Sequence, residues 1–248
     1  MNKTIETMLN HRSIRKFTEQ KLDQETINTL VDVARHTSTS NFMQSYSIIS
    51  VTDQDKKDKI AKVGNQEYIA SSGHLFIMVV DQNRNKTIAQ ENGQDTEVLH
   101  SFDRFLIGAS DALLASQNIL TAAESMGLGG VVLGSILNQA NEISEILDLP
   151  ELVFPILGIA LGYPDQSPQL KPRLPREHMH FENTYPKHEN LNESLKEYDD
   201  IVHEYYDLRD ANRRIDHFTK QITEGMDRKH PGRMKLLEYL QDKGFAKY

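Results

Sequence analysis

The part of this 248-residue chain that most limits how it can fold is a long, weakly charged stretch from Phe105 to Ala123. It is about as long as the ~20 residues that span a membrane, but it contains Asp111, Gln117 and Asn118, polar side chains that are costly in a bilayer. A helix that is apolar on most sides is otherwise buried in a core or at a subunit interface. The sequence therefore predicts a long internal helix and an oligomer.

Two apolar runs, Leu75 to Val80 and Val153 to Gly162, predict buried strands. Continuous apolar runs of this length are typical of strands that are covered on both faces. Residues 47–52 are rich in β-branched side chains and predict a third strand, and 131–133 predict a short extended piece.

Helices are predicted from apolar residues at three- and four-residue spacing and from residues that begin or end helices. Asp23 is expected to cap a helix that continues to about His36, and Gly64 is expected to end a helix over 56–63. The sequence also predicts an exposed excursion over 82–95, a helix over 96–126 that the glycine-rich turn 127–130 ends, and helices over 138–147, 195–206 and 234–243.

The order of these elements indicates an α+β domain with a central sheet between helices, because strands and helices do not alternate as in a doubly wound sheet. A chain of this length can form one large domain. After Tyr163 the composition becomes polar, with too few apolar runs for a separate core. We expect a single domain over 1–248, in which 164–248 form an extended C-terminal arm that packs on the body or on a partner subunit.

Composition excludes several functions. The formal net charge is −8, which disfavours binding to nucleic acid or to an anionic membrane. The chain has no cysteine, so disulfides, thiolate nucleophiles and thiolate metal sites are excluded. Residues 1–10 lack the apolar stretch of a secretory signal. We expect a cytoplasmic protein that has neither a nucleic-acid nor a membrane partner.

Two short basic strings provide cations for an anionic ligand. One is His11 to Arg15, and the other, Lys171 to Arg173, lies about 160 residues later. If the fold brings them together, they surround one dianionic group with imidazole, guanidinium, hydroxyl and ammonium donors, which suits a phosphate. Taken alone, Arg12 and Arg15 would more often be surface charges than ligands, and Lys171 and Arg173 are consistent with a polar segment after a strand end. The polar run 38–41 and the glycine turn add partners for a polyol and a flat ring, so together they indicate a phosphorylated cofactor.

Familiar catalytic motifs are absent from the sequence. The pattern G-x-G-x-x-G fails because Val132 occupies its third glycine position, and there is no G-x-S-x-G, phosphate loop or H-E-x-x-H. His178 and His180 form only half of a metal site and have no acidic partner at helical spacing, so we expect solvated histidines and no metal.

A third basic group follows two tyrosines near the end of the chain. Its arginines are consistent either with an exposed, salt-bridged loop or with a clamp for a 2′-phosphate. Tyr205 and Tyr206 are expected to anchor a helix rather than to stack on a ligand. The three arginines are Arg209, Arg213 and Arg214.

In four motifs that occur in the same order, the chain resembles the nitroreductase family. The motifs are residues 11–17 (HRSIRKF), 34–44 (ARHTSTSNFMQ), 123–130 (AESMGLGG) and 170–175 (LKPRLP). The resemblance covers nearly the whole chain and is greatest to the NADPH-dependent branch of oxygen-insensitive nitroreductases and flavin reductases.

This resemblance implies a homodimeric α+β flavoprotein, with a mainly antiparallel sheet and FMN at the dimer interface. The phosphate and ribityl chain are then held by His11, Arg12, Ser13, Lys171 and Arg173. The ring is contacted by Thr39 and Asn41, at its pyrimidine edge by Arg15 and Gln66, and near N5 by Gly129 and Gly130. NADPH is bound by Arg209 and Arg213.

The resemblance also implies a two-step exchange in which NADPH delivers hydride to flavin N5 and a nitroaromatic, a quinone or free flavin then accepts it. The charge of Arg15 is expected to stabilise the reduced ring, and no side chain acts as acid or base. Two other functions are consistent with the same residues: a dedicated NADPH:FMN flavin reductase, and an FMN-binding sensor or carrier that does not turn over.

Overall fold

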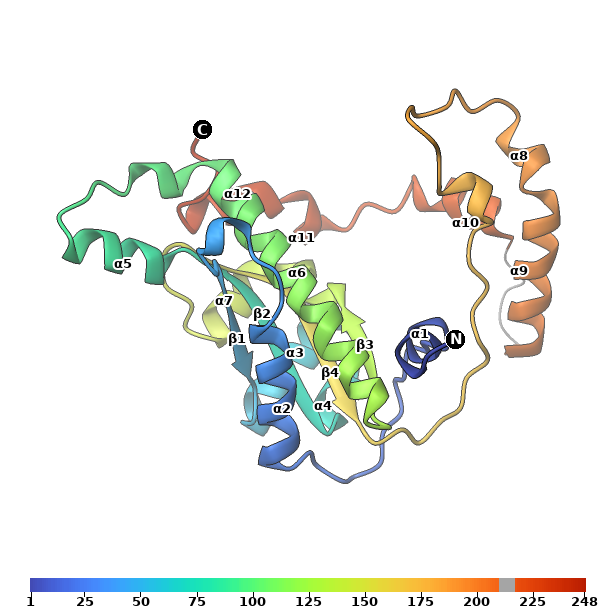
Figure 1. Ribbon diagram of the computed structural model, residues 1–248, viewed down its shortest axis with the longest axis horizontal. Helices are drawn as coiled ribbons and strands as arrows, with labels where there is room; N and C mark the ends of the chain where they lie inside the picture. Colours follow the sequence, from blue (N-terminus) through green and yellow to red (C-terminus); the bar gives the residue numbers. More distant parts are fainter. Residues whose placement is uncertain (210–216) are drawn as a thin grey trace. The chain divides into compact units, whose positions relative to one another are not determined.

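The computed structural model describes residues 1–209 and 217–248 (Figure 1). Contacts divide these residues into two compact units, Met1–Ser167 with His230–Tyr248, and Pro168–Lys229. The strands are β1 (Tyr46–Ser50), β2 (His74–Asp81), β3 (Gly129–Leu133) and β4 (Val153–Gly162).

The α-helices of the first unit are α1 (Lys3–Leu9), α2 (Gln24–Arg35), α3 (Gln54–Gly64), α4 (Tyr68–Ser71), α5 (Asn83–Glu91), α6 (Phe102–Ser125), α7 (Ala140–Ile146), α11 (Pro231–Met234) and α12 (Leu236–Asp242). Those of the second unit are α8 (Leu191–Ser194), α9 (Lys196–Arg209) and α10 (Phe218–Gly225). Short 3₁₀ helices are η1 (Ser40–Phe42), η2 (Glu97–His100), η3 (Gly134–Gln139) and η4 (Arg176–His178).

The four strands form one antiparallel sheet in the order β1-β2-β4-β3. In the two inner strands, Phe76 pairs with Ile159, and β2 is buried on both faces. Leu75 and Ile77 point to one face and Phe76 and Met78 to the other, as alternation along a strand requires. The prediction of an α+β fold with a mainly antiparallel sheet is confirmed.

Helices cover both faces of this sheet (Figure 1). On one face α6 crosses the strands and packs against α2, so that Ala112, Ala115 and Ile119 meet Phe76 and Met78. The other face is covered by α3, α4, η3 and α7. Within the described residues, no helix combines the length and the apolar character that crossing a membrane requires.

Several local predictions are confirmed. Asp23 caps α2 by accepting the N–H of Thr26 at 2.7 Å, and the apolar stripe of that helix buries Leu30 and Ala34. The end predicted for α3 was wrong, because the left-handed residue there is Asn65, with φ 51°, and not Gly64. Gly64 is buried in the last turn, where an added Cβ would lie 3.0 Å from Ser135 Oγ.

Three further boundaries differ from the predictions. Residues 82–95 are not only an exposed excursion, because they contain α5. The long helix does not begin at Thr96, since η2 comes first and Ser101 caps α6 through the N–H of Arg104. Of the glycines in the predicted turn, only Gly127 has a positive φ, of 81°, while Gly129 and Gly130 already belong to β3.

The helix predicted over 138–147 was also wrong in part, because residues up to Gln139 form η3 and α7 begins at Ala140. The last residues of the chain pack in the first unit, where Leu240 and Phe245 are buried against Phe154. The second unit has a small core of its own, in which Leu195, Tyr198 and Val202 are buried together. Tyr205 is buried on α9, as expected of a helix anchor, and the side chain of Tyr206 lies outside the described residues.

Candidate active site

The first basic string lies against the outer edge of the sheet. Its backbone is extended, and the N–H of Ile14 donates to the carbonyl oxygen of Gly130 at 2.9 Å, while Ser13 forms a parallel bridge with Gly130. Because side chains alternate along extended backbone, Ile14 is buried against β3 and Arg15 is exposed. The fold therefore presents Arg15 to solvent, while His11, Arg12 and Ser13 are half-buried.

Glycine at position 129 is required by this packing. A Cβ added there would lie 2.6 Å from Ile14 Cγ1 and 2.8 Å from Ile14 Cβ, distances that real atoms do not tolerate. The string and the first residues of β3 therefore approach each other as closely as backbone allows. This contact places Gly129 and Gly130 beside Ser13 and the residues that flank it.

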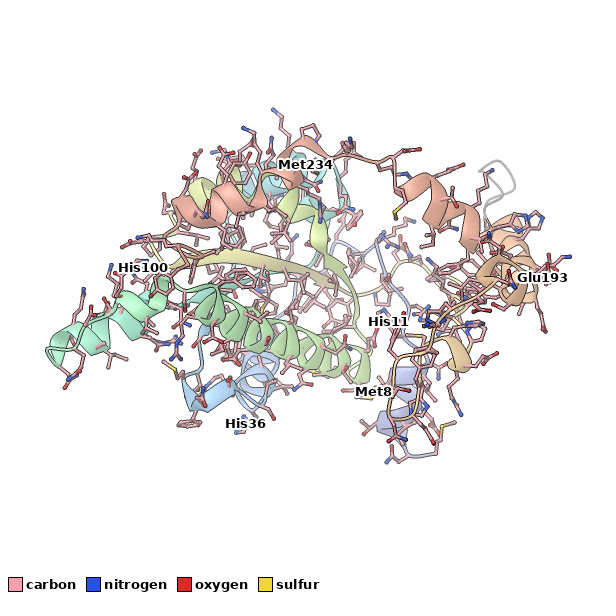
Figure 2. All side chains as sticks on the ribbon, turned by 90° about the horizontal axis from the view of Figure 1, so that it is seen from above. Met8, His11, His36, His100, Glu193 and Met234 are labelled. Atoms are coloured by element: carbon pink, nitrogen blue, oxygen red, sulfur yellow. The ribbon has the colours of Figure 1, made fainter. Side chains whose placement is uncertain are left out.

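The start of the string is attached to the C-terminal end of α6. His11 Nδ1 donates to Glu124 Oε1 at 2.5 Å, and this pair is mostly buried. Arg12 Nη1 donates to the carbonyl oxygen of Asn10 at 3.0 Å. In Figure 2, the label His100 marks the region just before the first turn of α6, and the label His11 lies near its last turn.

Arg15 lies beside the connection between α3 and α4. Its guanidinium lies near the half-buried Tyr68; burial raises the pKa of this phenol, and the nearby Arg15 opposes the rise. Two residues earlier, Gln66 Oε1 accepts a hydrogen bond from Ser135 Oγ at 2.7 Å. The structure thus brings Arg15 to the segment that carries Gln66.

The segment with Thr39 and Asn41 is attached to α6 at a different place from the first basic string. The segment that contains them is held to Asp111, whose carboxylate accepts the N–H of Ser40 at 2.9 Å. Asp111 and Glu124 are 13 positions apart on one helix, which corresponds to about 20 Å at 1.5 Å per residue. Within one chain, Thr39 and Asn41 are therefore not brought to the first basic string.

The second basic string, Lys171 to Arg173, lies in the second unit. Arg173 Nη1 donates to the carbonyl oxygen of Lys171 at 2.8 Å, so the string is folded back on itself. Both side chains are exposed. The side chain of Arg209 and the whole of Arg213 and Arg214 lie outside the described residues.

His178 and His180 are not deeply buried, and His180 is exposed. In the part of the chain that the structure describes, no group of three or more histidines and carboxylates could hold a metal ion. Glu124, Tyr68 and Ser135 were not identified from the sequence, because their contacts are made with residues far away along the chain.

Comparison with known proteins identifies the class to which this fold and this arrangement of residues belong. Residues 8–163 match the family model "Nitroreductase family", and residues 171–248 match "Nitroreductase family, C-terminal domain". The chain belongs to the nitroreductase family and is an oxidoreductase. The resemblance inferred from the four motifs is confirmed.

Three relatives match over essentially their whole length. The chain is 41% identical over 250 residues to "FMN reductase (NADPH)" of Bacillus subtilis (strain 168), with all of both chains covered. The structure of the NfrA1 nitroreductase from B. subtilis has a TM-score of 0.93 at 40% identity, covering 99% of this chain and 100% of that one. The NADPH:FMN oxidoreductase from Vibrio harveyi complexed with NAD⁺ has a TM-score of 0.89 at 37% identity, with both chains fully covered.

Proposed function

We propose that this protein is an FMN-dependent NADPH oxidoreductase that passes electrons from NADPH to free flavin, nitroaromatics or quinones. The observation that carries the proposal is the first basic string, held by the Ile14–Gly130 hydrogen bond against the glycines that begin β3. Relatives named FMN reductase (NADPH) and NADPH-flavin oxidoreductase match the full length of this chain and support the choice of FMN and NADPH.

The residues of the first unit suit a phosphorylated, flat cofactor. Arg12, Ser13 and His11 provide a guanidinium, a hydroxyl and an imidazole within three positions, which is the donor set that a phosphate and a polyol need. Gly129 and Gly130 allow the string to pack closely on β3, because a Cβ at these positions would meet Ile14 or the buried Leu120 and Leu161. We assign the FMN phosphate and ribityl chain to the string and the ring to these glycines.

Lys171 and Arg173 are proposed to complete the phosphate site. The backbone N–H of Asp165 donates to the carbonyl oxygen of Lys16 at 2.9 Å, so the chain leaves β4 beside the first string. The assignment of these two cations rests on the resemblance of residues 170–175 to the family motif.

A second copy of the chain is proposed to supply Thr39 and Asn41. These residues and the first string are attached to α6 about 20 Å apart, which is too far for one FMN ring to be contacted by both within one chain. The solvent-facing side of α6 carries exposed apolar residues, and such a surface is typical of a protein interface. They are Phe102, Leu106, Leu113 and Leu114. A homodimer built on α6 would bring Thr39 and Asn41 of one copy to the string of the other.

When bound, FMN supplies a ring that accepts a hydride at N5 and gives it to an acceptor. Arg15 is proposed to hold its positive charge at the pyrimidine edge, where the reduced ring becomes negative, and the nearby Tyr68 is proposed to orient this guanidinium. Gln66 is assigned to the same edge, and the N–H of Gly129 to N5. Arg209 and Arg213 are proposed to bind the 2′-phosphate of NADPH.

Anaerobic stopped-flow spectroscopy tests the proposal. The FMN-reconstituted protein should lose its absorbance near 450 nm after mixing with NADPH. With a typical kcat this takes roughly seconds or less, and the loss should be slower with NADH. Acceptors added one at a time, free FMN, a nitroaromatic and a quinone, should restore the colour at rates that identify the preferred oxidant. Retention of bound FMN without bleaching would instead support a sensor or carrier, and failure to bind FMN would contradict the proposal.

A further inference from the structure

The segment between α2 and β1 has an unusual backbone. Asn41, Phe42 and Gln44 have φ values of 51°, 56° and 48°, in the left-handed region that side chains other than glycine rarely occupy. Conformations of this kind cost of order 1 kcal/mol each and persist only where the surroundings impose them. Phe42 is 83% exposed, so its own packing in the chain does not impose the conformation.

A single carboxylate holds both ends of this segment. Asp111 Oδ1 accepts the N–H of Ser40 at 2.9 Å, and Asp111 Oδ2 accepts the N–H of Ser45 at 3.1 Å. Asp111 is only 1% exposed, and no basic side chain of the described residues lies within salt-bridge distance of it. A buried charge without a cationic partner is costly, and hydrogen bonds from backbone amides are what compensate it here.

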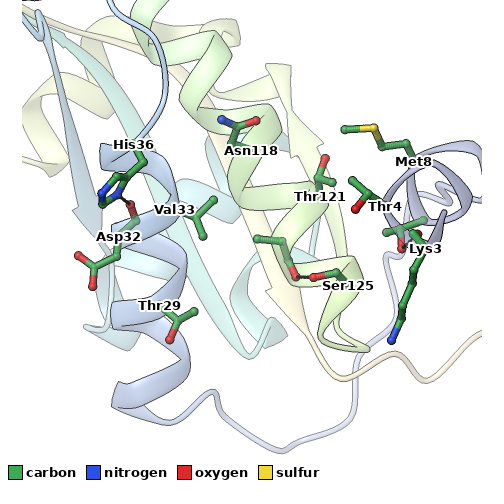
Figure 3. A pocket seen from close by; sticks show the side chains of 12 residues that line it. Lys3, Thr4, Met8, Thr29, Asp32, Val33, His36, Asn118, Thr121 and Ser125 are labelled. Atoms are coloured by element: carbon green, nitrogen blue, oxygen red, sulfur yellow. Dashed lines mark hydrogen bonds between the residues drawn. The ribbon is translucent and has the colours of Figure 1, made fainter.

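Two other positions on the same helix assist Asp111. Gly108 lies so close to the segment that an added Cβ would be 2.6 Å from the carbonyl oxygen of Ser45. About two turns beyond Asp111, Asn118 Nδ2 donates to Thr37 Oγ1 at 2.8 Å. Asn118 lies on α6 among the residues that line a pocket between α1, α2 and α6 (Figure 3). The helix thus fixes the segment at its beginning, middle and end.

We propose that Asp111 is a positioning residue for the flavin, because it imposes the left-handed turn that presents Thr39 and Asn41. This inference rests on the proposed function. Carboxylate chemistry is essential to it: an asparagine of nearly the same shape has one acceptor oxygen, and its amide group would meet the second N–H donor with another donor. Asp111 therefore acts on FMN through the backbone of residues 40–45, without touching it.

The test compares Asp111→Asn with a matched variant, Ser116→Ala. Ser116 is also 1% exposed on α6, but its hydroxyl donates to Ala112 O within the helix and does not reach the segment. We expect Asp111→Asn to weaken FMN binding at least ~10-fold, as expected for the loss of hydrogen bonds to a charged group. Amide hydrogen exchange at Ser40 and Ser45, measured without FMN, should accelerate in the same variant and remain unchanged in Ser116→Ala.

A rescue experiment separates positioning from a general loss of stability. Glycine adopts a positive φ without strain, so Asp111→Asn combined with Gln44→Gly should recover part of the FMN affinity. A merely structural role of Asp111 predicts no recovery, because glycine adds no contact. If Asp111→Asn alone does not fold, the double variant is compared with Gln44→Gly alone. The double variant should then bind FMN more weakly than Gln44→Gly.

Two negative outcomes have different meanings. Wild-type affinity for FMN in Asp111→Asn, or unchanged exchange at Ser40 and Ser45, would overturn the role of Asp111 and leave the proposed function intact. Absence of FMN binding by the wild-type protein would overturn the proposed function itself, and with it this inference.

Discussion

At the scale of single residues, we expect the hydroxyl of Tyr68 to orient the nearby Arg15 by a hydrogen bond. Tyr68→Phe keeps the half-buried ring and removes this hydrogen bond. A typical hydrogen bond contributes about 1 kcal/mol, which for a two-electron couple equals a decrease of about 20 mV in the potential of bound FMN. We expect a decrease of this size, because a mobile guanidinium stabilises the reduced ring less well. Spectroelectrochemistry or equilibration with reference dyes measures it.

The control for this variant is Tyr239→Phe. Tyr239 on α12 also loses a hydroxyl contact, a 3.5 Å hydrogen bond to Gln139 Oε1, but it contacts neither the string nor α4. Its flavin potential should equal that of the wild type. An unchanged potential in Tyr68→Phe would mean that Arg15 does not depend on the phenol.

Acid stability should depend on His74. This residue is buried at the start of β2 beside Phe76, and burial, assisted by the charge of Lys57, lowers its pKa to about 4. The unfolded chain binds the proton below about pH 6.5 and the folded chain only below about 4. The free energy of unfolding should therefore decrease as pH falls from about 6.5 to 4, by up to about 3 kcal/mol.

In His74→Phe this pH dependence should largely disappear, because the ring remains and the titrating group is gone. The exposed His36 provides a control, since His36→Gln should keep the wild-type profile. Urea unfolding between pH 4 and 7 measures both. Parallel profiles for His74→Phe and the wild type would show that other groups cause the acid sensitivity.

Residue types were easier to predict from the sequence than their partners. The first string, the polar run and the glycines were recognised because they are contiguous motifs. Glu124, Tyr68 and Asp111 were not, because each lies 53 to 113 positions from the segment it contacts, and single-sequence patterns contain no information about such contacts. Whether FMN contacts the chosen residues stays a prediction.

At the scale of secondary-structure elements, Gly129→Ala tests the contact between the string and β3. The new Cβ would overlap Ile14, and overpacking of this kind costs roughly 1–3 kcal/mol. We expect a lower melting temperature together with weaker FMN binding, since the Ile14–Gly130 hydrogen bond must stretch. Gly127→Ala is the comparison: it meets no atom within 4 Å but strains a left-handed φ of 81°. It should lower the melting temperature and leave FMN affinity unchanged.

The same elements indicate how far sequence patterns can be trusted. The strands β2 and β4 and the helices α2 and α6 were predicted because their apolar periodicity is strong. The helix α5 was missed because it buries no residue, so it has no apolar stripe to detect. The end of α3 was misplaced because Gly64 is required by packing against Ser135, a reason that no local pattern contains.

At the scale of the whole molecule, the proposed homodimer is tested by Leu106→Glu. Leu106 is 52% exposed on the solvent side of α6 within one chain, and a carboxylate there would be buried without a partner in an α6 interface. We expect sedimentation velocity to detect a monomer, and we expect this monomer to have lost FMN.

Leu237→Glu is a matched control for this prediction, because Leu237 on α12 is 59% exposed and lies in the part of the chain's end that packs in its own first unit. It should sediment like the wild type. If Leu106→Glu remains a dimer and retains its FMN, the interface does not use this face of α6.

The two segments that we propose to contact the flavin are attached far apart on α6, and this separation has a consequence for enzyme assays. If each prosthetic group is shared by two polypeptides, dilution will release it as the polypeptides part. Specific activity should then decline in assays at very low enzyme concentration and return when riboflavin phosphate is added to the buffer. An enzyme that holds its chromophore within one polypeptide would be indifferent to such dilution.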